Sequence, residues 1–80
     1  MRVISTDGMI NVSYENNSFV VIVDDGNKEY TVSARGSDLL HYVPLAVYDS
    51  QERAVEEMKK MADKAASLLA VDGDFVYQLP

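Results

Sequence analysis

The chain has 80 residues, a net charge of -6 and no cysteine, and these properties argue against several classes of protein. The length fits one domain, residues 1–80, whose small core leaves it marginally stable. The absence of cysteine excludes disulfides and thiolate metal sites as a source of stability. The acidic charge argues against duplex nucleic acid as a partner, because such binding needs a basic surface. No apolar run reaches the roughly 20 residues of a membrane span, so we expect no membrane partner.

The N-terminal part of the chain predicts two short strands. The first covers residues 2–5 and ends at the turn sequence TDG at 6–8. Residues 9–14 alternate between apolar and polar side chains, as in a strand with one buried face, and ENN at 15–17 fits a tight turn. The opening also lacks the apolar core of a signal peptide. We therefore expect a cytoplasmic protein.

Residues 18–24 predict a third strand of a different kind, because FVVIV at 19–23 is apolar without interruption. Both faces of such a strand require cover. A hairpin turn leads from it to an alternating strand over 28–34. One helix covers one face of a small sheet, so the second face needs either a long apolar loop or another subunit. The chain has no long apolar loop, and we predict a homo-oligomer, a dimer or higher.

The C-terminal half predicts an interrupted strand, a helix and a last strand. Residues 39–48 form the strand, which Pro44 places at an edge or a bulge because proline cannot donate to a ladder. Residues 50–69 carry apolar side chains at three- and four-residue steps, which predicts an amphipathic helix. Residues 75–79 form the last strand. The predicted fold is α+β: an antiparallel β-sheet of four to six strands with one long amphipathic helix packed on one face, in the order β-β-β-β-β-α-β.

The predicted helix carries its own terminal signals. We expect Asp49 to cap its N-terminus, with Glu52 in the spacing of a capping box. We also expect Arg53 to form a surface pair with Glu57, one turn further along the helix.

Catalysis and metal binding receive little support from the sequence. His41 is the sole histidine and stands among apolar neighbours in LLHYV, which favours a strand residue over a general base. Ser37 lies nearby but lacks the glycine context of a nucleophile elbow. The aspartates at 24–25 and 72–74 lack the spacing of a calcium loop and indicate turns. We predict no enzymatic activity, no metal and no cofactor.

The strongest candidate for ligand recognition is the loop that follows the 28–34 strand. Arg35 supplies a forked donor, Gly36 permits close approach of the backbone, and Ser37 adds a hydroxyl, a combination that suits a phosphate group. Tyr42 and Tyr30 offer flat faces on which a base can stack. The alternative is an ordinary polar loop with a solvated arginine. The predicted ligand-binding residues are Arg35, Gly36, Ser37, His41, Tyr42 and Arg53.

The two ends of the chain carry recognisable segments: the opening MRVISTDG, the stretch NVSYE at 11–15, the segment LAVYDSQERAVEEMKKMADKA and the closing FVYQLP. Together they resemble a family of small uncharacterised proteins common in phages and prophages of Firmicutes. Ser13 stands where the family has proline, and residues 17–42 are not matched. The resemblance implies no activity, but it implies a phage-borne protein that acts inside a bacterial cell.

Small acidic phage proteins without catalytic motifs often act by binding, and this analogy of class guides the functional prediction. We predict an anti-defence protein that binds and sequesters a host nucleotide immune signal, such as a cyclic nucleotide or an ADP-ribose derivative, without cleaving it. The alternative is a protein–protein interaction module that inhibits or regulates a host or phage protein.

Overall fold

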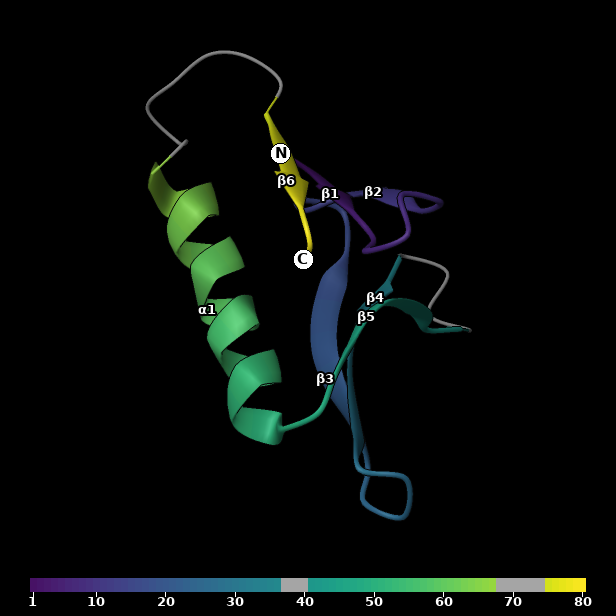
Figure 1. Ribbon diagram of the computed structural model, residues 1–80. Coiled ribbons are helices and arrows are strands. Elements are labelled where there is room, and N and C mark those ends of the chain that lie inside the picture. The colour runs from purple at the N-terminus through teal and green to yellow at the C-terminus, as the bar shows by residue number, and fades with distance from the viewer. Residues whose placement is uncertain (37–40, 68–74) are drawn as a thin grey trace.

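The computed structural model describes residues 1–36, 41–67 and 75–80. The elements follow one another as β1 (Arg2–Ile4), β2 (Asn11–Ser13), β3 (Ser18–Asp24), β4 (Glu29–Arg35), β5 (Val43–Tyr48), α1 (Gln51–Ser67) and β6 (Val76–Gln78). This order confirms the predicted α+β class and the β-β-β-β-β-α-β sequence of elements (Figure 1). The start of the predicted fifth strand and the last two residues of the predicted helix lie outside the described residues. Within those ranges, no helix is long and apolar enough to span a membrane.

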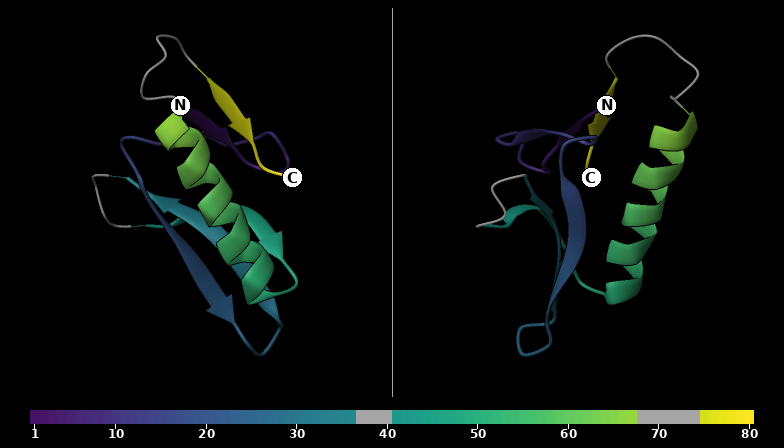
Figure 2. Two further views of the ribbon diagram at one scale, coloured as in Figure 1. Left: turned by 90° about the vertical axis from the view of Figure 1, so that its left-hand side faces the viewer. Right: turned by 180° about the vertical axis from the view of Figure 1, so that it is seen from behind.

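The six strands form two sheets, which differs from the single sheet drawn from the sequence. The long sheet has the order β3-β4-β5 and is antiparallel throughout. The short sheet has the order β2-β1-β6, in which β1 is antiparallel to β2 and parallel to β6. β6 runs parallel to β1 because α1 returns the chain to the end of the molecule where β1 begins (Figure 1). α1 lies across one face of the long sheet, and the short sheet lies toward one end of it (Figure 2).

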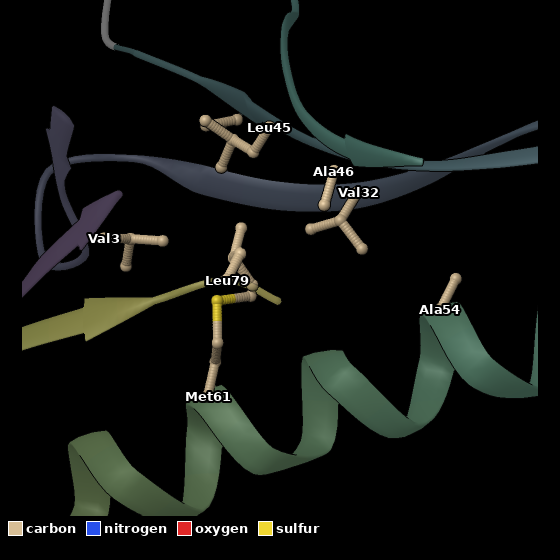
Figure 3. Close-up of a cluster of buried hydrophobic side chains, with 8 residues drawn as sticks. Val3, Val32, Leu45, Ala46, Ala54, Met61 and Leu79 are labelled. Carbon is tan, nitrogen blue, oxygen red and sulfur yellow. The ribbon is translucent and has the colours of Figure 1, made fainter. Parts of the chain in front are cut away.

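The core lies between α1 and the long sheet and extends to the short sheet. Met61 from the helix and Val32 from the long sheet are almost wholly buried. Leu79, after β6, lies close to Met61 in this space (Figure 3), and its N–H donates to the carbonyl of Ile4 at 3.0 Å. The buried apolar residues are Val3, Val32, Ala34, Leu45, Ala46, Ala54, Met61 and Leu79.

Pro44 marks a bulge on β5, as the sequence predicts. Val32 pairs with Ala46 whereas Ser33 pairs with Pro44, so Leu45 is an extra residue on β5. The Leu45 side chain is buried in the core. Its carbonyl accepts a hydrogen bond from the backbone N–H of Thr6 at 3.0 Å. The bulge therefore links β5 to the turn that follows β1.

The first turn of α1 corrects two expectations. Ser50 is the capping residue, because its Oγ accepts a hydrogen bond from the backbone N–H of Arg53 at 3.2 Å. Asp49 instead pairs with Arg53, with 3.4 Å between its Oδ1 and the arginine Nη1. The predicted cap at Asp49 and the predicted Arg53–Glu57 pair are therefore wrong. The helix begins at Gln51, one residue later than expected, and this shift transfers the cap to Ser50.

The face of the long sheet that points away from α1, hereafter the outer face, is partly apolar. Ile22, Thr31 and Val47 lie side by side on it across three strands, because directly paired residues share a face. Val20 lies two residues from Ile22 on the same face. The exposed fraction is 42% for Ile22 and 58% for Val47. The helix therefore leaves the second face of the 19–23 segment partly exposed, as the sequence predicts, and oligomerisation stays a prediction.

Candidate functional site

Arg35 and Tyr42 come together at the loop predicted to bind a ligand. Arg35 is the last residue of β4 and Tyr42 directly precedes β5, so the antiparallel pairing of these strands brings the two residues to the same end of the sheet. The guanidinium carbon of Arg35 lies 4.8 Å from the centroid of the Tyr42 ring. Such a cation–π contact contributes about 0.5–1 kcal/mol at an exposed site. It also restricts the orientation of the guanidinium group.

Two buried polar atoms on β4 have no hydrogen-bond partner among the described residues: Nε of Arg35 and Oγ of Ser33. The two side chains are two residues apart on one strand and therefore share the outer face. An unpaired buried donor or acceptor costs about 1–3 kcal/mol, so such atoms in a folded domain require an explanation. Because Nε of Arg35 is itself buried, a ligand could not contact this atom without a movement of the side chain.

Two further residues of the predicted loop site, Gly36 and His41, are neighbours of this pair in the chain. Gly36 follows Arg35 directly and is half-buried, and His41 is exposed beside Tyr42. Ser37 lies outside the described residues. The structure thus brings Arg35, Gly36, His41 and Tyr42 to one end of the β4–β5 hairpin.

Arg53 does not join this group within one chain. It lies in the first turn of α1, which follows the end of β5, where Tyr48 pairs with Tyr30 at the start of β4. Arg35 lies at the other end of β4, about 20 Å away along a seven-residue strand. The nearest charged partner of Arg53 is Asp49, and both side chains are largely exposed.

A groove elsewhere on the described surface has the wrong charge for a phosphate. It has a volume of about 810 Å³ and runs along the first turns of α1 beside Tyr30. The helix N-terminus favours anions in principle, but Asp49, Glu52 and Glu56 line the groove and Lys59 is the one cation among its described lining residues. The negative charge of the three carboxylates opposes phosphate binding here. We therefore place the candidate site at Arg35 and Tyr42 and not in this groove.

A polar cluster inside the molecule was not foreseen from the sequence. Glu57 of α1 is 6% exposed, and its Oε1 accepts a hydrogen bond from the Tyr77 hydroxyl at 2.6 Å. Burial raises the pKa of Tyr77 well above its usual range, and the hydrogen bond to Glu57 raises it further. Burial, followed by the charge of Glu57, also raises the pKa of Tyr48. Both phenols therefore stay protonated at neutral pH, which suits a structural role and not that of a base or nucleophile.

The sequence contains a signal for this cluster. Glu57 occupies a position of the helix face that also carries Ala54 and Met61, at the three- and four-residue spacing of a buried stripe. An acidic residue in such a stripe indicates a buried carboxylate that needs a donor. Within the described residues, no group of three or more histidine, aspartate or glutamate side chains is arranged to hold a metal ion.

Comparison of the chain with protein-family models, with curated proteins and with solved structures finds no match.

Proposed function

We propose that this protein is a non-catalytic binding protein that sequesters a small phosphorylated nucleotide at the Arg35–Tyr42 site. The observation that carries the proposal is the stacked pair itself, with the Arg35 guanidinium carbon 4.8 Å from the Tyr42 ring centroid. A guanidinium group held in one orientation loses little entropy when it binds a phosphate with two parallel hydrogen bonds. Tyr42 is 41% exposed and retains surface on which a base can stack.

The affinity that sequestration needs leads to a proposed oligomer. Nanomolar binding corresponds to about -12 kcal/mol. A charged hydrogen bond contributes about 1.5–3 kcal/mol, and stacking of one base contributes about 1–3 kcal/mol. With two such hydrogen bonds to one phosphate and one stacked base, one Arg35–Tyr42 pair supplies about 4–9 kcal/mol, which is less than the required free energy. Two copies would present two such pairs to a ligand with more than one phosphate, and the partly apolar outer face supports self-association.

The proposed context is anti-defence activity in the cytoplasm of a host bacterium. It rests on the resemblance of both chain ends to small phage proteins, and the nucleotide would be a host immune signal such as a cyclic nucleotide or an ADP-ribose derivative. Sequestration without cleavage would lower the free concentration of the signal while leaving it chemically intact.

Calorimetric titration with cyclic dinucleotides, cyclic mononucleotides and ADP-ribose derivatives tests this function. We expect one class to bind, Arg35→Ala to weaken binding about tenfold or more, and chromatography to recover the ligand unchanged. Arg53→Ala is the matched control, since it removes the same charge from the first turn of α1, away from Arg35, and is expected to leave the affinity unchanged. Binding weaker than micromolar by every ligand, or equal loss in both variants, would contradict the proposal.

The second candidate function is a protein-interaction module, and the exposed apolar side chains of the outer face favour it. Ile22 and Val47 present aliphatic surface without an intramolecular cover in the described residues. A host or phage protein that binds this face would be recovered from a bacterial lysate in stoichiometric amount. Recovery of such a partner together with an absence of nucleotide binding would favour this alternative.

A further inference from the structure

β3 is a long edge strand whose second side is unpaired within the described chain. It has seven residues, and each pairs with a residue of β4 in uninterrupted register. The long sheet has the order β3-β4-β5, so no described strand lies on the other side of β3. Figure 2 shows β3 as one border of the sheet, with α1 over its face and not along its edge. An edge of this kind presents a row of free N–H and C=O groups to any strand that approaches.

The two edges of the long sheet differ in the devices that discourage pairing. β5 carries Pro44 and the bulge at Leu45, and both devices block a continuous ladder. β3 has no proline, no bulge and no lysine. Its interior is the apolar run from Phe19 to Val23, and its one charged residue, Asp24, stands at the end. An unprotected apolar edge of this length favours pairing with another strand.

We propose that β3 pairs with β3 of a second copy of the chain, antiparallel about a two-fold axis at Val21, so that two long sheets join into one. In this register all seven residues are paired, and Asp24 lies opposite Ser18 of the partner. A parallel pairing in register would place Asp24 against Asp24, and like charges directly opposite each other destabilise a sheet. The charge pattern of the strand therefore selects the antiparallel arrangement.

The same register also pairs the exposed side chains of the edge. Ile22 lies opposite Val20 of the partner on the outer face, and aliphatic β-branched pairs of this kind stabilise a ladder. Val23, which is 44% exposed, lies opposite Phe19 of the partner on the helix face. Because Val21 lies on the two-fold axis, both copies of α1 lie on the same side of the joined sheet. This self-association does not depend on nucleotide binding. In its register the two Arg35 positions lie about 25 Å apart, so it is distinct from an arrangement in which two Arg35–Tyr42 pairs contact one small ligand.

Sedimentation equilibrium and hydrogen exchange on the full chain, without ligand, test the pairing. We expect a dimer at micromolar concentration. In an antiparallel strand successive N–H groups point to alternate neighbouring strands. The β3 amides that do not donate to β4 would therefore donate to the partner strand, and we expect their exchange rate in the dimer to be lower by about tenfold or more than after dilution to monomer. A stable monomer, or a dimer whose outward β3 amides exchange as fast as in the monomer, would overturn the inference. Because neither measurement involves a ligand, a result that refutes the β3 pairing leaves the proposed nucleotide binding to be tested separately.

Single cysteines distinguish edge pairing from stacking of two outer faces, since the chain has no native cysteine. Ile22→Cys and Val47→Cys replace exposed residues of the same face. In the joined sheet the two Ile22 positions are diagonal neighbours about 8 Å apart, whereas the two Val47 positions are separated by five strand spacings, about 24 Å. A short bifunctional maleimide is expected to link Ile22→Cys into a covalent dimer and to leave Val47→Cys unlinked. Linkage of Val47→Cys alone or of both variants equally would refute edge pairing.

Discussion

Substitution of Tyr77 by phenylalanine tests whether the buried tyrosine–glutamate contact holds the two parts of the fold together. The Tyr77 hydroxyl on β6 donates to Glu57 on α1 at 2.6 Å, and Glu57 is 6% exposed. The variant keeps the ring and removes the donor, so a buried carboxylate loses its hydrogen bond. Hydrogen bonds to charged groups contribute about 1.5–3 kcal/mol. In a domain of this size each kcal/mol corresponds to about 4–8 °C in melting temperature, so we expect a fall of roughly 10 °C.

Tyr48→Phe is the matched control in the same region. The Tyr48 hydroxyl is buried and has no hydrogen-bond partner among the described residues, so its removal relieves an unpaired polar group and is expected to be neutral or stabilising. Urea unfolding followed by circular dichroism measures both variants. A double-mutant cycle that combines Tyr77→Phe with Glu57→Gln isolates the energy of the pair. Equal losses for Tyr77→Phe and Tyr48→Phe, or a coupling energy near zero, would refute the reasoning.

Three further predictions concern the tyrosines, a turn and the helix cap. The pKa values of Tyr48 and Tyr77 are raised in the folded state, so the folded chain keeps phenolic protons that the unfolded chain releases near pH 10. The free energy of unfolding, measured with urea, should therefore fall as the pH rises above about 10. A free energy of unfolding that stays constant through this range would contradict the raised pKa values. Gly8→Ala should lower the free energy of unfolding in urea by about 1 kcal/mol. Gly8 has a φ of 77° and an added Cβ would meet no neighbouring atom, so backbone strain is the sole cause of this loss. Ser50→Ala should lower the free energy of unfolding by about 1 kcal/mol, because it removes the helix cap. Asp49→Ala should lower it by only a few tenths of a kcal/mol, because the pair of Asp49 with Arg53 is exposed. A larger loss for Asp49→Ala than for Ser50→Ala would indicate that Asp49 is the cap.

The strands and the helix could be predicted from the order of apolar and polar residues along the chain. The uninterrupted apolar run at 19–23 and the alternation after it predicted β3 and β4 within one residue of their bounds, because strand pairing depends on side-chain period and turn chemistry that are local. The three- and four-residue spacing predicted α1 for the same reason. Pro44 located the bulge because a residue without an N–H cannot continue a ladder.

Contacts between distant segments depended on the tertiary structure. The sequence predicted Arg35 and Arg53 in one binding site, but Arg35 is the last residue of β4, whereas Arg53 lies on α1, which starts near the other end of that strand. The division into two sheets arises because β6 returns beside β1 and not at the edge of the long sheet. That return also buries Glu57 under Tyr77. Periodicity describes which side of an element is apolar, but the partner of a buried carboxylate is set by which segment the folded chain brings to it.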